Sequence, residues 1–271
     1  MGRLPQDYPP AQHVLRDLRL WSEAGAEPAR AGIFVSREQF GATGACSAGA
    51  LAVLVDAVAG GAALRAAPDS WIATSDMRLH WMASAGAGEL VARTQLLRSG
   101  RSSIVLEAEV HAAERLVAHA TVAFSRIEAE GEYQQRPRGE RLGRVEFGAA
   151  SAGFSRPWAE CMGARVLDAA AGAVELPLTP YVGNSLGGLQ GGIAVALLDF
   201  AAEAAGTAEL GCAAATRDLA VHFLAIGRKG PIHTRATKLR RGGDELLLRV
   251  ESRDRGADDR LCTVATATVS A

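Results

Sequence analysis

Two stretches of similar sequence decide the fold, SAGALAVLVDAVAG (residues 47–60) and QGGIAVALLDFAAE (residues 190–203). Neither leaves a polar face at helical spacing, which is typical of a helix that is buried on all sides. An aspartate interrupts each stretch nine residues after its first residue, at Asp56 and at Asp199. A buried carboxylate is costly unless it is partnered or functional. The repetition favours a functional role over the alternative, a carboxylate satisfied by N–H groups in a core.

The repeat continues into the segments that follow the helices. TSDMRLHWMA (74–83) and TRDLAVHFLA (216–225) share the pattern T-x-D-x-x-x-H-[FW]-x-A. Their alternation of apolar and polar residues predicts a strand in each half. A shorter β-like segment precedes each helix, and three more follow: 31–36, 89–98, 104–112 and 115–125 in the first half, and 172–178, 231–240, 245–253 and 260–270 in the second. Each half is therefore predicted to be an antiparallel sheet curled around its helix.

The length of 271 residues and the repeat predict two domains joined by a linker. We place the domains at residues 18–125 and 151–271. The charged segment 126–150 contains Gly and Pro and is expected to be the linker. Residues 1–17 are expected to be a partly ordered lead-in.

Composition narrows the class of protein. The 29 basic and 30 acidic residues are balanced, which argues against nucleic acid or an anionic membrane as the partner. The four cysteines have no spacing typical of a metal site, so we expect no bound metal and a reduced compartment. The N-terminus does not resemble a signal peptide, and no apolar run reaches the roughly 20 residues of a membrane span. These features predict a cytoplasmic protein.

A second motif surrounds the start of the later helix. It reads N-x-x-G-x-x-Q-G-G-(x6)-D, at Asn184, Gly187, Gln190, Gly191, Gly192 and Asp199. With the two repeats, it resembles the acyl-CoA thioesterases of the hotdog fold, the phenylacetate-pathway and 4-hydroxybenzoyl-CoA types, where His usually stands in place of the Gln. The resemblance covers residues 18–125 and 160–270. It implies an α+β double hotdog, in which two sheets, each wrapped around a long central apolar helix, pair side by side.

The resemblance also implies two composite sites, because the acid of one unit meets the helix N-terminus of the other. The members of the first site are Asp56, Thr74, Asn184, Gln190 and Gly191. Those of the second are Asp199, Thr216, Ser47 and Ala48. In the second site Gly41 replaces the Asn, Ser47 the His or Gln, and Ala48 the first Gly. We therefore expect the second site to be weaker or silent.

Thioester hydrolysis needs an activated water or a carboxylate nucleophile, and donors for the charge that grows on the carbonyl oxygen. Asp56 is the expected base or nucleophile, and its apolar surroundings should raise its pKa. The N–H of Gly191 at a helix start and the amide of Gln190 are the expected donors to the carbonyl. Asn184 would orient the thioester or the water, and Thr74 would hold the water.

The predicted function is therefore that of an acyl-CoA thioesterase that hydrolyses a small or medium acyl or aryl thioester, with coenzyme A thioester as substrate and no cofactor. The alternative is a non-catalytic acyl-CoA or fatty-acyl binding protein on the same scaffold. Two such chains could also associate as a homodimer.

Several polar residues outside these sites have two interpretations. Arg98 and Arg101 lie near a turn and could bind the phosphates of coenzyme A, or face solvent. The pairs Asp76/His80 and Asp218/His222 could be acid–base pairs, although a solvated sheet face is the more common arrangement. Glu203, one turn beyond Asp199, either lines the second site or is an ordinary exposed helix residue, and we expect the latter.

Overall fold

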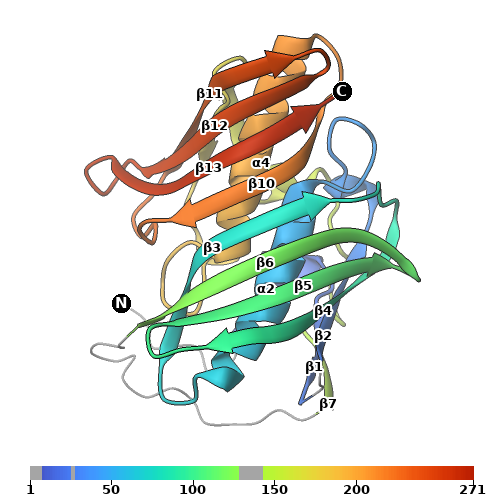
Figure 1. Cartoon of the computed structure of the whole chain (residues 1–271), viewed down its shortest axis with the longest axis vertical. Helices are drawn as coiled ribbons and strands as arrows, with labels where there is room; N and C mark the ends of the chain where they lie inside the picture. The colour runs from blue at the N-terminus through green and yellow to red at the C-terminus, as the bar shows by residue number, and fades with distance from the viewer. Residues whose placement is uncertain (1–7, 26–27, 128–142) are drawn as a thin grey trace.

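The computed structural model describes residues 8–25, 28–127 and 143–271, and in them 13 strands form one antiparallel sheet (Figure 1). The strands are β1 (Trp21–Ala24), β2 (Ala29–Val35), β3 (Trp71–Trp81), β4 (Gly88–Ser99), β5 (Ser103–Ala112), β6 (Arg115–Ile127), β7 (Gly143–Glu146), β8 (Arg165–Asp168), β9 (Ala173–Leu176), β10 (Ala215–Phe223), β11 (Ile232–Gly242), β12 (Glu245–Asp254) and β13 (Arg260–Ser270). The helices are α1 (Val14–Asp17), α2 (Ala48–Ala66), α3 (Trp158–Cys161) and α4 (Gly191–Leu210), with 3-10 turns η1 (Arg37–Gln39) and η3 (Pro180–Val182). The predicted antiparallel sheet is confirmed.

The order of the strands reflects the repeat in the sequence. It runs β7-β1-β2-β4-β5-β6-β3-β10-β13-β12-β11-β9-β8. Outward from β3 lie β6, β5, β4 and β2, and outward from β10 lie their counterparts β13, β12, β11 and β9. The sheet is continuous between the halves because β3 pairs with β10, with Leu79 opposite Leu219 and Met77 opposite Val221. These four side chains are buried, so the junction is part of the core.

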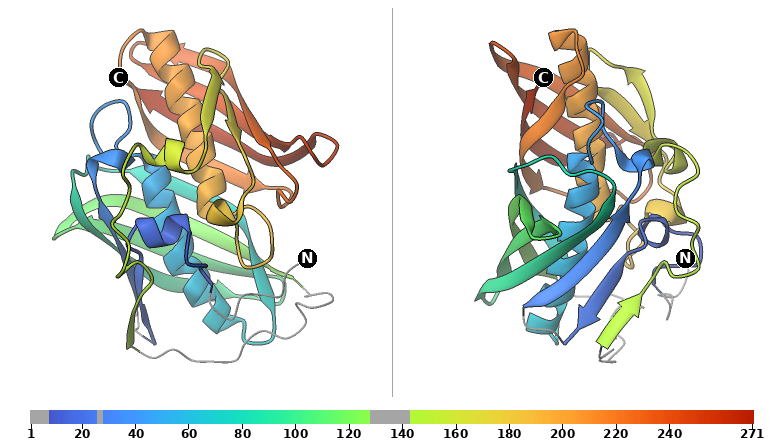
Figure 2. Two further views of the ribbon diagram at one scale, coloured as in Figure 1. Left: turned by 180° about the vertical axis from the view of Figure 1, so that it is seen from behind. Right: turned by 90° about the vertical axis from the view of Figure 1, so that its right-hand side faces the viewer.

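The two long helices lie on the same face of this sheet (Figure 2). α2 packs against β2–β6, and α4 packs against β9–β13. Ser47 caps α2 by accepting a hydrogen bond from Ala50 N, and Gln190 caps α4 in the same way from Ile193 N. Gly211 ends α4 at φ 74°, a left-handed conformation that favours glycine. Capping at matched positions therefore starts both helices at equivalent places.

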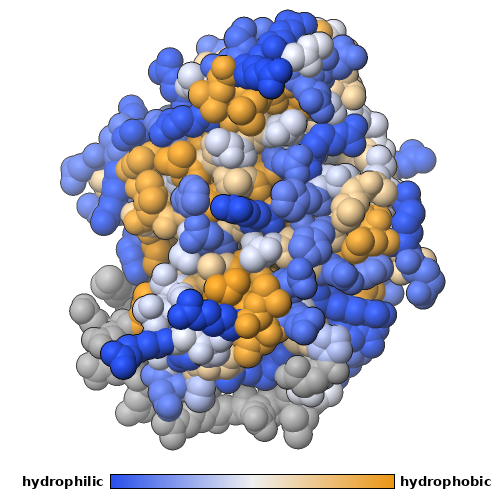
Figure 3. Space-filling model, in the orientation of Figure 1, coloured by the Kyte–Doolittle hydropathy of each residue, from blue (hydrophilic) through white to orange (hydrophobic). Residues whose placement is uncertain are grey.

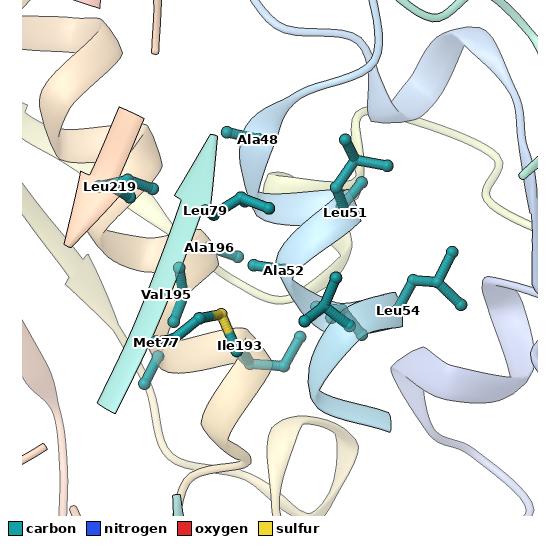
Figure 4. Packing of buried hydrophobic residues seen from close by; sticks show 14 of the residues in the cluster. Ala48, Leu51, Ala52, Leu54, Met77, Leu79, Ile193, Val195, Ala196 and Leu219 are labelled. Atoms are coloured by element: carbon teal, nitrogen blue, oxygen red, sulfur yellow. The ribbon is translucent and has the colours of Figure 1, made fainter. Parts of the chain in front are cut away.

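The N-terminal halves of α2 and α4 pack antiparallel against each other, with a glycine at each contact. A Cβ on Gly49 would lie 2.7 Å from Ala196 Cα, and one on Gly192 would lie 2.5 Å from Val53 Cα. Any larger residue at either position would push the helices apart. Figure 4 shows this layer, where Ala52 of α2 lies near Ala196 of α4. The close approach brings the start of each helix to the aspartate of the other.

The outer face of the sheet is largely hydrophilic, with separate hydrophobic patches (Figure 3). Two histidine–aspartate pairs cross the β3–β10 junction there. Nδ1 of His80 lies 2.5 Å from Asp218 Oδ1, and Nδ1 of His222 lies 2.6 Å from Asp76 Oδ1. All four side chains are about half exposed, between 48% and 59%. The residues considered as acid–base pairs within each half instead pair across the halves, on a solvent-facing surface.

Three features depart from the sequence predictions or extend them. Residues 8–17, expected as part of a partly ordered lead-in, contain α1, with Val14 and Leu15 buried. Of the predicted linker 126–150, residues 128–142 lie outside the described residues, and Gly143–Glu146 form β7, which pairs with β1. The strands β1, β7 and β8 have four residues each, too few for a periodic signal. The domain boundaries themselves remain a prediction.

By length and composition alone, one helix among the described residues, α2, could cross a membrane. Its 19 residues come closer to that length than we expected from the sequence, and 67% of its apolar window is buried inside the protein.

Candidate active site

Asp56 lies in the middle of α2 with only 8% of its surface exposed. The hydroxyl of Thr74, at the start of β3, donates a hydrogen bond of 2.9 Å to Asp56 Oδ1. Nε2 of Gln190 donates one of 2.6 Å to Asp56 Oδ2. The carboxylate of the first half is therefore held by one side-chain donor from its own half and one from the other.

Gln190 has a fixed orientation because it is also the N-cap of α4. Its Oε1 accepts a hydrogen bond of 2.7 Å from the backbone N–H of Ile193. Since that oxygen must face the helix, the amide nitrogen must face Asp56. One of the two N–H groups of this amide is thus directed at the carboxylate, and the predicted donation of the amide to a substrate carbonyl stays a prediction.

The two glycines at the start of α4 have different places in the site. A Cβ on Gly191 would lie 2.8 Å from both Asp56 Oδ1 and Thr74 Oγ1, so this position borders the carboxylate directly. The backbone N–H of Gly192 donates to Asp56. Within the described part of the chain, the N–H of Gly191 donates to no protein acceptor, so this group at the positive end of a helix is available to a ligand oxygen.

The ionisation of Asp56 is set by two opposing effects. Burial raises the pKa of Asp56 from 3.8 to about 6, while hydrogen bonds from Thr74 and Gly192 oppose this rise by favouring the charged form. The predicted rise is therefore present. A carboxylate with a pKa near 6 is mostly ionised at neutral pH and can still accept a proton.

A cavity of about 590 Å³ opens beside Asp56. All five residues predicted for the first site line it: Asp56, Thr74, Asn184, Gln190 and Gly191. Its wall continues along α2 beyond Asp56, with Ala57, Val58, Gly60, Gly61 and Leu64. This wall is mainly apolar and also includes Leu15, Leu20, Trp71 and Phe124 from other segments. The site thus joins a carboxylate, an unused helix N–H and an apolar space, as pockets for small molecules commonly do.

Asn184 lines the cavity, but its side chain is engaged in its own loop. Oδ1 accepts hydrogen bonds from the N–H groups of Leu186 (2.8 Å) and Gly188 (3.0 Å), and Nδ2 donates to the carbonyl of Leu189. Both lone pairs of Oδ1 are used, so it cannot also accept from a water. Asn184 therefore shapes the loop that leads to Gln190, and its predicted role in orienting the thioester or the water, for which the second N–H of Nδ2 remains, stays a prediction.

The second site is less complete. Asp199 is fully buried, and its Oδ2 accepts a hydrogen bond of 2.7 Å from the N–H of Gly49. Thr216 partly opposes the rise in the pKa of Asp199, yet Asp199 Oδ1 and Thr216 Oγ1 have no hydrogen-bond partner among the described residues. The hydroxyl of Ser47 is used to cap α2 and does not reach the carboxylate.

The space beside the second site is also smaller, about 210 Å³. Ala48, Thr216 and Glu203 line it. Glu203 is therefore not the ordinary exposed residue that we expected. Burial, and next the charge of Asp199, raise the pKa of Glu203, while Ala42 N–H opposes the rise. Burial likewise raises the pKa of Asp199, so the two carboxyls compete for charge.

The structure does not bring the remaining predicted residues to the cavity. Arg98 and Arg101 are exposed, and neither lines the cavity, whereas Arg30 and Arg65 do. A role of Arg98 and Arg101 with coenzyme A phosphates stays a prediction. In the described ranges no cluster of three or more His, Cys, Asp or Glu side chains is arranged to hold a metal ion.

Two residues of the N-terminal segment were missed by the sequence analysis. Tyr8 lines the cavity, and its hydroxyl donates to the carbonyl of Gly183 at 3.1 Å. Nε2 of the buried His13 donates to the same carbonyl at 2.9 Å, because its Nδ1 accepts from Leu15 N. Burial raises the pKa of Tyr8 and lowers that of His13, which favours the neutral form of both. No periodicity or motif marked this segment.

Comparison with known proteins supports the fold and the resemblance. Residues 43–119, from just before α2 into β6, match the thioesterase superfamily. No curated protein matches the sequence of the chain. Acyl-CoA thioesterase II TesB2 from Mycobacterium marinum has a TM-score of 0.59 at 14% identity, with 95% of this chain and 97% of that chain covered.

Two further solved structures cover the same share of both chains, 95% and 97%. The tesB protein of Mycobacterium avium subs paratuberculosis has a TM-score of 0.61 at 15% identity. A conserved protein of unknown function with a hot dog fold from Alicyclobacillus acidocaldarius has a TM-score of 0.61 at 12% identity. This chain therefore has the hotdog fold, and its predicted resemblance to the hotdog-fold thioesterases is confirmed.

Proposed function

We propose that the chain is an acyl-CoA thioesterase built from two hotdog units paired side by side, with α2 and α4 as their central helices. The carboxylate of Asp56 is its catalytic group. The observation that carries the proposal is the arrangement of Thr74, Gln190 and Gly191 around this carboxylate in an apolar cavity of about 590 Å³. The match of residues 43–119 to the thioesterase superfamily supports it independently.

In the proposed reaction Asp56 acts as a general base. It takes a proton from a water whose oxygen attacks the thioester carbon, and the carbonyl oxygen accepts the N–H of Gly191 as its charge grows. When the tetrahedral intermediate collapses, the carbon–sulfur bond breaks and the thiolate takes the proton from Asp56. The products are a carboxylic acid and free coenzyme A. Thr74 and Gln190 keep the carboxylate in position throughout.

A nucleophilic role for Asp56 is the alternative, through a mixed anhydride. Both carboxylate oxygens already accept hydrogen bonds, from Thr74 and Gln190, which reduces their nucleophilicity and favours the general base. Single turnover in ¹⁸O-water tests the nucleophilic mechanism. If water attacks the aspartyl carbonyl of the anhydride, ¹⁸O enters Asp56, a result that the general-base route cannot give because it places ¹⁸O only in the released acid.

The proposed substrate carries a small or medium acyl or aryl group, and the thioester itself is the source of coenzyme A, so no further cofactor takes part. From Asp56 to Leu64 the cavity wall follows eight residues of α2, a distance of about 12 Å at the rise of a helix. We also propose that the protein works in the cytoplasm, which its free cysteines suit. Pairing of two chains would be tested by light scattering.

The test is a panel of acyl- and aryl-CoA thioesters of increasing length, with release of thiol followed by a thiol-reactive dye. Hydrolysis should be fastest for one range of chain length and depend on Asp56. Cys212 is exposed and will react with the dye, so the rate without substrate has to be subtracted. If the protein binds acyl-CoA but releases no thiol with any substrate of the panel, the binding-protein alternative is correct.

A further inference from the structure

The two helices differ at the position one turn after each aspartate. In α2 this position is Gly60, which lines the large cavity. In α4 the equivalent position is Glu203, which lines the small one. A glycine leaves the wall of the first cavity open, whereas a glutamate projects a long side chain into the second.

Glu203 extends across the second site to the opposite half. A Cβ on Gly41 would lie 2.5 Å from Glu203 Oε1, so a larger residue there would require the carboxyl of Glu203 to shift. The backbone N–H of Ala42 also donates to Glu203. The counterpart of Gly41 in the first site is Asn184, which lines the same cavity as Gly60. The exchange is complementary, since the first site has Gly60 on the helix and Asn184 in the loop, and the second has Glu203 on the helix and Gly41 in the loop.

A second exchange lies three residues before Glu203 on α4. Ala57, the residue after Asp56, lines the large cavity, and its counterpart after Asp199 is Phe200. The ring of Phe200 packs edge to face on Trp158 of α3, with 5.2 Å between ring centroids, and Trp158 is buried. Phe200 does not line the small cavity, and its partly buried ring packs against the core at the position where the first half has open wall.

We propose that Glu203 and Phe200 close the second acyl channel, by which we mean the counterpart in the second site of the apolar cavity beside Asp56. The residues at these two helix positions then determine which of the two related sites admits an acyl chain. The inference rests on the proposed function only in assigning the apolar cavity to the acyl group. It predicts one acyl-binding site per chain. It also predicts that exchange of the two residues between the helices moves the channel.

The first test opens the second channel. The probe is an alkyl-CoA thioether, which has a methylene in place of the thioester carbonyl and cannot be hydrolysed. Calorimetric titration should give one molecule bound per chain for the wild type and two for Phe200→Ala/Glu203→Gly. Glu203→Gln is the matched control, because it keeps the volume and removes the charge, and it should still bind one. A folded double variant that binds one molecule overturns the proposal.

The converse test closes the first channel with a substitution that leaves no cavity in the core. A Cβ on Gly60 would meet only the ring of Phe124, at 3.9 Å, so Gly60→Glu is compatible with the helix. We expect thioether affinity and turnover to fall by at least about tenfold, as for an overfilled pocket. Gly60→Ala should lose far less, chiefly for longer chains. Wild-type affinity in a folded Gly60→Glu variant contradicts the proposal.

These measurements separate the inference from the proposed function. If the wild type binds one thioether per chain and hydrolyses no thioester, the thioesterase assignment fails and the assignment of the channels stands. If it hydrolyses thioesters while the two exchanges leave the number of bound molecules and the affinity unchanged, the reverse holds.

Discussion

The first and second sites share a scaffold and an aspartate but differ in what surrounds the carboxylate. Asp56 accepts hydrogen bonds from Thr74 and Gln190 and faces a cavity of about 590 Å³. Asp199 accepts one from Gly49, leaves Oδ1 without a partner in the described chain, and does not line the neighbouring cavity of about 210 Å³. A symmetric backbone therefore places the acids equivalently, while a few side chains at the helix starts decide whether each acid has partners and space.

The largest expected difference between the sites is in the acid itself. Asp56→Asn should lower kcat by about 10²–10⁴-fold, because it removes the general base. Asp199→Asn should lower it far less. Steady-state hydrolysis of the best substrate in the panel measures both, with circular dichroism to show that each variant is folded. Equal losses in the two variants would mean that the sites work together.

The caps of the two helices provide the next comparison. Gln190→Ala removes both a cap and a donor to Asp56, so kcat should fall by about 10²-fold, as for loss of one oriented donor. Ser47→Ala removes only a cap, and should lower the free energy of unfolding by about 1 kcal/mol with turnover near wild type. Kinetics and urea unfolding of the two variants give both quantities. A Gln190→Ala variant with normal kcat contradicts the role given to the amide.

The pH dependence sharpens the comparison because it isolates Asp56. Hydrolysis should increase with pH through about 6, the pKa of Asp56, as the base becomes ionised. Since burial raises this pKa above its unfolded value near 3.8, the folded state binds the proton more tightly. Ionisation of Asp56 should therefore destabilise the fold between pH 4 and 6 by up to about 3 kcal/mol, at 1.4 kcal/mol per pKa unit.

The check is urea unfolding at pH 4.5 and at pH 7.5. The wild type should lose more stability over this range than Asp56→Asn does, whatever the contribution of the other carboxyls. An equal loss in both proteins would show that burial does not raise this pKa.

The smallest expected effect is at the junction of the halves. His80→Ala and His222→Ala each remove one exposed pair, and each should lower the free energy of unfolding by less than about 1 kcal/mol. The symmetry of the junction predicts equal losses, which thermal unfolding measures. A large difference between the two would mean that the halves are not equivalent even where their backbones pair.

The sequence allowed the main elements to be predicted because each is periodic and occurs twice. The apolar helices, the alternating strands and the spacing from Asp56 to Thr74 all follow from one repeat. That Asp56 meets Gln190 across the halves came from a family resemblance, since no local pattern joins residues that far apart. What pairs the two is the close packing of α2 and α4 at Gly49 and Gly192.

The sequence did not allow the directions and contacts of several side chains to be predicted. Asn184 has the amide expected of a substrate ligand, yet the nearby N–H groups of its loop use its oxygen first. Nothing in the spacing of Glu203 from Asp199 distinguishes it in the sequence from a charged residue on an exposed helix face, so it was expected at the surface. Tyr8 reaches the cavity from a segment with no repeat. Such contacts depend on tertiary geometry, which spacing alone does not determine.

The covalent connection of the two halves has a genetic consequence. In a dimer of identical units, every substitution appears in both sites at once, so a residue that closes one must close the other. Here β3 and β10 join the halves into one sheet while each half keeps its own codons. Mutation can therefore alter the residue after Asp199 and leave Ala57 unchanged. One half can therefore keep its site residues while the other changes to a purely structural role.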